Sequence, residues 1–235
     1  MGFSIDFGII VLAALIHASL QLSVGCLLLL HRQGLMAKLL HKNSKDLAGS
    51  FVSGVGLLIM LAIMATGFVI LNLSGHSLPA GFWCVLIGML AGLALATWLL
   101  YYKKAGTTLW IPRTFSDFLA KRIKKTDSTT EAFGLGMVSV VGEAPFAFVL
   151  VLVAASAMVS LDSTWQLLAV GVYTLIAISP LVVTCLAIKK QGSVSGIQKW
   201  RMSNKTFLKL IGGCGFLVLA AVLIVFKLMP ILGVI

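Results

Sequence analysis

Six long apolar segments restrict this chain more than any other feature of its sequence. Each is long enough for a helix to cross roughly 30 Å of hydrocarbon. The segments must be helical, because lipid offers no hydrogen-bond partners to an unpaired backbone. The sequence therefore predicts an all-α polytopic membrane protein with six transmembrane helices. These helices are expected at residues 7–30, 47–72, 81–102, 132–160, 164–188 and 206–230.

The composition agrees with a membrane fold. Hydrophobic residues make up 60% of the 235 residues, charged residues only 11%, and the mean hydropathy is +1.08. In soluble domains about a quarter of the residues are charged. Six spans leave no room for a separate soluble domain of ordinary size, so we expect one membrane domain. The N-terminus carries Asp6 and no nearby Lys or Arg, so it lacks the basic start of a cleavable signal peptide.

The basic residues indicate topology rather than nucleic-acid binding. The net charge is +11, but Lys and Arg concentrate in the gaps after the first, third and fifth apolar segments. The gaps at 72–80 and 161–163 contain none. By the positive-inside rule we expect an integral plasma membrane protein with the three basic gaps in the cytoplasm and both termini outside. Lys227, at the outer end of the sixth segment, is expected to snorkel to the interface.

The gap at 103–131 contains the pattern of an amphipathic helix. Its apolar residues recur at helical spacing: Phe115, Phe118, Leu119 and Ile123. Its C-terminal end, where cations suit the helix dipole, carries Lys121, Arg122, Lys124 and Lys125. We expect a short helix in the cytoplasmic interface that binds lipid headgroups, with docking of a partner at Trp110 to Lys125 as the alternative. Ser128 and Glu131 have the spacing of an N-terminal cap for the fourth span.

The chain divides into two halves of three helices, at 1–102 and 132–235, that enter the membrane from opposite sides. Three helices followed by three inverted helices are a recurring transporter plan, with the binding site near the midplane between the repeats. When the two leading helices are overlaid, His17 corresponds to Glu143. Both lie about ten residues into their spans, so each is expected roughly 15 Å deep, near the middle of the bilayer.

A polar cluster is predicted around this pair. Glu143 is the only acid near the middle of an apolar segment, where a carboxylate must face protein or water. Helical spacing places Gln21 on the face of His17 and Ser139 on the face of Glu143. Two prolines each remove a backbone hydrogen bond and free a carbonyl that can line a cavity. The predicted substrate- or proton-binding residues are His17, Gln21, Ser139, Glu143, Pro145, Ser179 and Pro180.

A His and a Glu at this depth allow three roles. They can relay protons or bind a transported solute, they can form a structural pair that fixes helix registry, or they can act as a catalytic pair. A metal site would have only His17, Glu143 and Gln21 as ligands. We find no nucleotide-binding loop, no His-Glu-x-x-His and no nucleophile elbow, so we expect no enzyme activity, no cofactor and no metal.

Small residues predict where helices approach closely. Gly88 and Gly92 form a Gly-x-x-x-Gly pair in the third segment. The same role is expected in the second and sixth segments for Gly49, Ser53, Gly56, Gly212, Gly213 and Gly215. Ordinary packing within one bundle is sufficient to explain all of them.

The layout resembles the six-span, three-plus-three group that includes LysE-type exporters, nickel/cobalt exporters and CcdA-like thiol electron carriers. The resemblance covers the whole chain as topology, with a polar interruption in the first and fourth spans. CcdA-like proteins place a cysteine in each of those spans, whereas here Cys26 lies in the first and none in the fourth. The Pro-Gly-Pro-type signature of LysE-like exporters is absent, and Ser19 stands where a proline would pair with Pro145.

The sequence and this resemblance together imply a membrane transporter-like protein that moves a small solute or ion by alternating access. The alternative is a non-transporting membrane subunit or scaffold, in which the His17–Glu143 pair is structural and the basic linker docks a partner. A redox carrier would require Cys26 and Cys185 to approach each other. The bilayer is the expected surrounding, and both a homo-oligomer and a cytoplasmic partner stay open.

Overall fold

The computed structural model describes residues 2–21, 23–30, 46–75, 78–100, 113–189 and 203–233, and every regular element in these ranges is a helix. Five helices are long and apolar enough to cross a membrane, or six if a bent pair counts as one span. The expected all-α membrane fold is confirmed at that level. The main helices are α1 (Gly2–Ser19), α3 (Leu47–Ser74), α4 (Ala80–Leu100), α5 (Arg113–Lys125), α6 (Thr129–Val159), α7 (Ser163–Lys189) and α9 (Lys205–Leu223).

Local capping explains where two of the spans begin. The carboxylate of Asp46 accepts the backbone N–H of Gly49 at 3.0 Å and starts α3. The Ser128 hydroxyl accepts the backbone N–H of Glu131 at 3.2 Å, and the Glu131 carboxylate accepts the backbone N–H of Asp127 at 3.3 Å. This reciprocal arrangement satisfies donors that a helix start leaves unpaired. The predicted cap of the fourth span is therefore confirmed.

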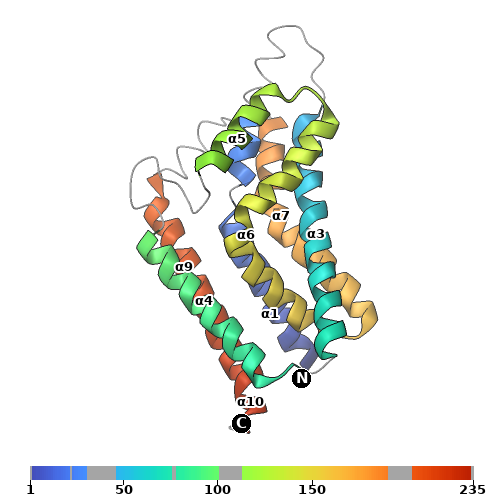
Figure 1. The fold of residues 1–235 in the computed structure, drawn as a ribbon, viewed down its shortest axis with the longest axis vertical. Helices are drawn as coiled ribbons and strands as arrows, with labels where there is room; N and C mark the ends of the chain where they lie inside the picture. Colours follow the sequence, from blue (N-terminus) through green and yellow to red (C-terminus); the bar gives the residue numbers. More distant parts are fainter. Residues whose placement is uncertain are drawn as a thin grey trace.

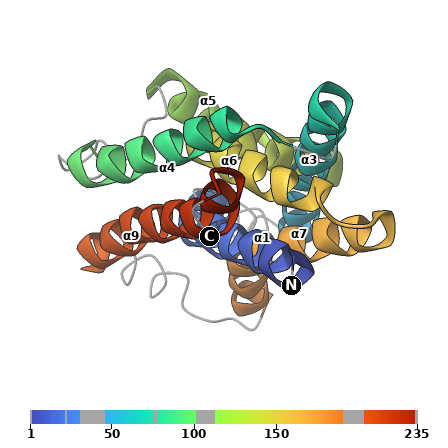
Figure 2. The ribbon, with the colours of Figure 1, turned by 90° about the horizontal axis from the view of Figure 1, so that it is seen from below.

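The helices form two groups (Figure 1). In the first group α6 packs against α1 and α3, and α7 packs against the same two helices. In the second, α4 and α9 pack against each other, and contacts of α9 with α1 and of α4 with α6 join this pair to the first group. Both termini lie at one end of the molecule, and α5 lies at the other (Figures 1 and 2).

The amphipathic helix is found where the linker predicted it, as α5. Its Leu119 and Ile123 are buried, and the helix packs on α6, whereas Phe118 is 53% exposed. Trp110 lies outside the described residues, as do most cations of the basic gaps, at 31–45, 101–112 and 190–202. The orientation in the membrane therefore stays a prediction.

The first span is not the continuous helix expected over 7–30. It consists of two helices, Phe3–Ser19 and Ser23–Leu30, that are bent by 47° relative to each other. Neither Gly nor Pro lies at the break, but the Ser19 hydroxyl donates to the Ile16 carbonyl at 2.7 Å in the last turn before it. The sixth span is irregular as well, because a π-helical turn, η1 (Ile224–Leu228), and the short α10 (Met229–Ile231) prolong α9. Lys227, in that turn, does not snorkel outward: it forms an ion pair with Asp6 of α1.

The closest helix approach is between α3 and α6. A Cβ on Gly54 would run into the carbonyl oxygen of Phe133, and a Cβ on Gly136 into that of Phe51. Among the predicted contact glycines, Gly56, Gly212, Gly213 and Gly215 do face side chains of a neighbouring helix. The Gly88 and Gly92 pair does not, since no described atom lies within 4 Å of a Cβ on either. The expectation that this pair packs inside the bundle is wrong.

We expect Gly54→Ala to destabilise the protein, because the added methyl group would meet backbone atoms of α6. Overpacking of this kind lowers the free energy of unfolding by about 1–3 kcal/mol. Gly88→Ala is the matched control, since its Cβ would stand in open space. Thermal unfolding of both purified variants in detergent measures the difference. Equal unfolding temperatures would contradict the close α3–α6 contact.

Candidate polar site at the broken first span

Five buried polar side chains lie at the break in the first span. His17 lies in the last turn of α1, Gln21 lies within the break, and Ser23 begins the helix that follows it. Glu143 reaches this point from the middle of α6, and Tyr173 from α7. All five are buried, with His17 2% and Glu143 3% exposed. The His17–Glu143 pair expected from the overlay of the two halves is thus in contact.

The Glu143 carboxylate caps the helix Ser23–Leu30. Its Oε1 atom accepts the backbone N–H of Ser23 at 2.7 Å and the Ser23 hydroxyl at 2.6 Å. The N-terminus of a helix carries a partial positive charge and unpaired N–H groups, and both favour a carboxylate there. Hydrogen bonds to an ionised acceptor are also stronger than those between neutral groups. Glu143 and the break in the first span therefore stabilise each other.

Two serines extend this contact into a chain of oxygen atoms. The Ser23 and Ser139 hydroxyl oxygens lie 2.9 Å apart, and the Ser139 hydroxyl donates to the Gly136 carbonyl at 2.7 Å. Together with the Ser23–Glu143 contact this makes three oxygen–oxygen hydrogen bonds, but each hydroxyl supplies only one proton. With Glu143 ionised, one of the three contacts lacks a proton. With Glu143 protonated at Oε1, all three can be made at once, although the backbone N–H of Ser23 then faces a protonated oxygen, which is a weaker acceptor than a carboxylate.

His17 lies between Glu143 and Tyr173. Its Nδ1 atom is 2.9 Å from the Tyr173 hydroxyl, and its Nε2 atom is 3.7 Å from Glu143 Oε2. If the tyrosine hydroxyl donates to Nδ1, then Nε2 carries the ring proton and points it toward the carboxylate. His17 also lies at the C-terminal end of α1, and Glu143 lies at the N-terminus of the helix Ser23–Leu30, so the two side chains lie at the two ends of the broken span.

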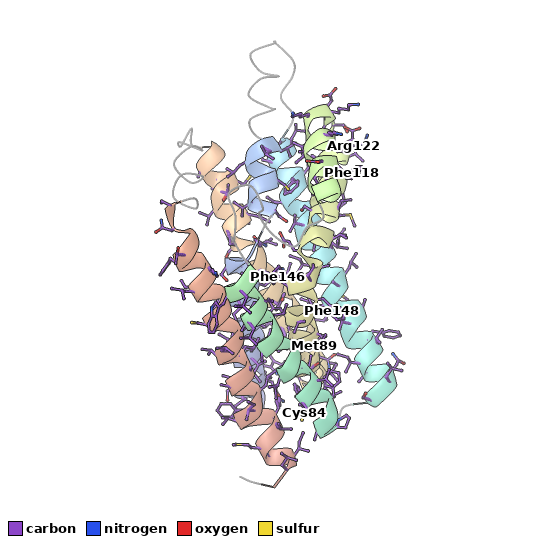
Figure 3. The ribbon with its side chains drawn as sticks, turned by 60° about the vertical axis from the view of Figure 1, so that its left-hand side comes forward. Cys84, Met89, Phe118, Arg122, Phe146 and Phe148 are labelled. Carbon is purple, nitrogen blue, oxygen red and sulfur yellow. The ribbon has the colours of Figure 1, made fainter. Side chains whose placement is uncertain are left out.

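The remaining predicted site residues differ in their surroundings. Gln21 is 1% exposed and Ser139 3%, so both belong to the buried centre. Pro145 faces away from it: with Ala144 and Phe148 it borders an open apolar cavity of about 520 Å³ between α4 and α6. Figure 3 shows the cavity's Met89, on α4, close to Phe148, on α6.

Ser179 and Pro180 are not brought into the cluster. Ser179 is exposed on α7, and its hydroxyl donates to the carbonyl of Ile176 at 2.8 Å. This is the carbonyl that Pro180, without an N–H, leaves unpaired. The two residues thus compensate each other locally, as hydroxyls often do beside prolines in membrane helices. Their contacts explain both without a ligand.

Two residues of the site, Ser23 and Tyr173, were absent from the sequence-based prediction. Ser23 comes two residues after Gln21 in an apolar segment, so a polar run across the break was visible in the sequence. Tyr173 is fully buried, and a buried phenol needs a hydrogen-bond partner, which was the available signal. Neither signal specifies the partner, because both contacts join residues far apart in the chain.

Metal ligands and cysteines are two other possible sources of chemistry in the described part of the chain. No group of three His, Cys, Asp or Glu side chains there is placed to hold a metal ion. Cys26, Cys84, Cys185 and Cys214 are all free thiols. No protein-family model, curated protein or solved structure matches this chain. The site must therefore be interpreted from its own geometry, which is that of a buried carboxylate and a buried imidazole 3.7 Å apart.

We expect Ser23→Ala and Glu143→Gln to be strongly coupled in their effect on stability, because Ser23→Ala removes the hydroxyl that donates to Glu143 and Glu143→Gln removes the charge that strengthens this hydrogen bond. A double-mutant cycle of unfolding free energies should give an interaction energy within about 0.5–3 kcal/mol. Ser179→Ala combined with Glu143→Gln is the control cycle and should be additive, since Ser179 is exposed and bonds its own helix. Additivity of the Ser23 cycle would contradict the capping contact.

Proposed function

We propose that this protein is an integral membrane transporter that moves a small solute or ion. The substrate passes through the polar site at the break of the first span, and Glu143 is the group that binds and releases a proton. The observation that carries the proposal is that Ser23 and Ser139 make three oxygen–oxygen contacts but supply only two hydroxyl protons, so that an ionised Glu143 leaves one contact without a proton. The same oxygen atoms accommodate both charge states of Glu143, and the protonated state fills one more hydrogen bond. A group that must change its protonation in the membrane needs such surroundings.

The broken span supports the same proposal. Discontinuous membrane helices commonly form the substrate and ion sites of transporters, with the positive end of a half-helix directed at an anionic group. Here the helix Ser23–Leu30 directs its first N–H group at Glu143. A break at membrane depth exposes backbone groups, which is tolerated where protein or a water-filled cavity satisfies them.

Two inverted repeats are the architecture that we infer for this transporter. A twofold axis that exchanges the halves would pair α1 with α6, α3 with α7, and α4 with α9. Under that exchange the contact of α1 with α7 corresponds to the contact of α6 with α3, and α1 with α9 corresponds to α6 with α4. All of these contacts occur. The packing is thus compatible with the symmetry from which the His17–Glu143 pairing was predicted.

We infer a simple sequence of steps from the geometry. His17, between the Tyr173 hydroxyl and the Glu143 carboxylate, can pass a proton to Glu143 or hold it as a second site. Protonation neutralises Glu143, weakens its hold on the positive end of the helix Ser23–Leu30, and so favours relative movement of α1 and α6. The exchange of a solute or ion for this proton would then couple the two flows.

We expect Glu143→Gln to abolish proton-coupled flux, because the amide keeps the shape of the side chain but cannot bind and release a proton. The measurement is internal pH in liposomes that contain the purified protein and a pH-sensitive dye, challenged with amines, amino acids, and monovalent and divalent cations. Glu131→Gln is the matched control on the same helix, since Glu131 lies at the α6 start with its side chain 42% exposed. Unchanged proton-coupled flux in a folded Glu143→Gln variant would contradict the proposal.

A second candidate is a membrane subunit that does not transport and that holds a partner through α5. The observation in its favour is the exposed face of that helix, where Phe118, 53% exposed, lies beside exposed cations (Figure 3). One of them, Arg122, lies 4.0 Å from Glu131, which ties α5 to the start of α6. In this case the His17–Glu143 pair would only fix helix registry.

The second candidate predicts that charge reversal on α5 releases a co-purifying protein. The variant carries Lys121→Glu, Arg122→Glu, Lys124→Glu and Lys125→Glu, all at exposed positions, so the fold should be kept. The measurement is the protein composition after mild-detergent purification of both forms. A wild-type preparation with no stoichiometric partner, or one whose partner survives the reversal, would count against this function.

A further inference from the structure

A second buried ion pair lies at the end of the bundle that carries both termini. Lys227 of η1 contacts the carboxylate of Asp6 on α1, and its Nζ atom lies 5.6 Å from the centre of the Trp83 ring on α4. Asp6 is 5% exposed and Trp83 3%, and the Lys227 side chain is 16% exposed. One carboxylate and one aromatic face thus hold the ammonium group, and three helices meet at it.

The π-helical turn gives Lys227 this position. A π-turn adds a residue to a helical turn and so changes the face on which the following side chains lie; such turns are frequent at functional sites. Lys227 belongs to the five residues of η1, near the end of the sixth span. In a regular helix this close to the interface, a lysine would extend toward the headgroups. The irregular turn is thus associated with a lysine held inward.

Asp6 lies on the same face of α1 as His17. The residues between them on that face are Ile10 and Ala13, at steps of four, three and four, and they are 1% and 0% exposed. With a rise of 1.5 Å per residue, the ion pair lies roughly 16 Å along α1 from the polar site. The bundle is therefore closed, between the site and the end that carries the termini, by the ion pair and two tightly packed apolar side chains.

We propose that Asp6 and Lys227 are a gating pair: their ion pair holds α9 against α1 and closes the path between the Glu143 site and the end of the bundle where the termini lie. This inference rests on the proposed transport function. Opening separates the pair, so that Lys227 extends to the membrane interface and Asp6 meets water. Each charge then exchanges its partner for solvation, so neither remains buried alone, which would be costly. Because both charges can be solvated when they separate, this ion pair can open and close, as a gate requires.

The gate is tested by thiol labelling at Ala13, between the pair and the site. The four native cysteines are replaced by serine, Ala13→Cys is introduced, and the rate of modification by a maleimide is measured in detergent. In the parent protein Cys at this fully buried position should react slowly. We expect Asp6→Asn to raise the rate about tenfold, because the open state becomes more populated. Lys227→Met should act likewise, and the exchange Asp6→Lys with Lys227→Asp should restore protection.

Two controls separate a gate from a structural contact. Ala132→Cys, also 0% exposed but at the start of α6 near the opposite end, should keep its slow rate in every variant. Glu131→Gln should leave the Ala13 rate unchanged, since the ion pair is intact and Glu131 lies at the exposed start of α6. An unchanged Ala13 rate in Asp6→Asn would overturn the gate, as would a parallel rise at Ala132. Failure of both single variants to fold, while the exchanged pair folds normally, would mark a structural contact and overturn it too.

The labelling experiment does not need transport activity, so the two proposals can fail separately. If Glu143→Gln removes flux but Asp6→Asn leaves Ala13 protected, the transport site stands and the gate does not. If Asp6→Asn exposes Ala13 while Glu143→Gln keeps full flux, the bundle opens at this pair but Glu143 is not the coupling group, and the gating role as proposed here fails with it.

Discussion

A carboxylate in the middle of a membrane-spanning helix must be satisfied by protein, and most of this structure follows from how Glu143 is satisfied. The first span breaks, so that the start of the helix Ser23–Leu30 can donate to it. Ser139, one turn earlier on α6, bonds the Gly136 carbonyl, and Gly136 also lacks the side chain that would push α3 away. One short stretch of α6 thus fixes the packing of α1 and of α3.

The parts of the fold that the sequence could predict are those that depend on length, hydropathy and local caps. Apolar segments of sufficient length gave the spans, the spacing of Ser128 and Glu131 gave the start of α6, and the His17–Glu143 contact followed from an overlay of the two halves. The break in the first span could not be predicted, because residues 20–22 contain no Gly or Pro. The carboxylate that caps the helix after the break lies 120 residues away in the chain.

Other predictions fail because spacing along a helix does not show which neighbour a side chain faces. A sequence places Lys227 near a helix end but does not show its neighbour: in the structure Lys227 lies in the π-helical turn η1, which packs against α4, and contacts Asp6 of α1. Spacing gives Gly88 and Gly92 the pattern of a contact surface, yet no described atom lies within 4 Å of a Cβ at either position. The hydroxyl of Ser179 was predicted to bind a ligand, but it donates to the Ile176 carbonyl, which Pro180 leaves unpaired. In each case the correct prediction requires the positions of the neighbouring atoms, which the sequence does not give.

The number of hydroxyl protons around Glu143 is an argument for a functional role of the His17–Glu143 pair over a purely structural one. A structural pair needs one state in which every contact is made, and His17 with Glu143 alone would fix registry between α1 and α6. The chain from Glu143 through Ser23 and Ser139 to the Gly136 carbonyl is longer than that purpose requires, and with Glu143 ionised it is one proton short. Ser139→Ala would remove the shortage and leave the Ser23–Glu143 contact in place, so that contact does not require the Ser139 hydroxyl. The second hydroxyl suits a Glu143 that is protonated during part of the proposed transport cycle.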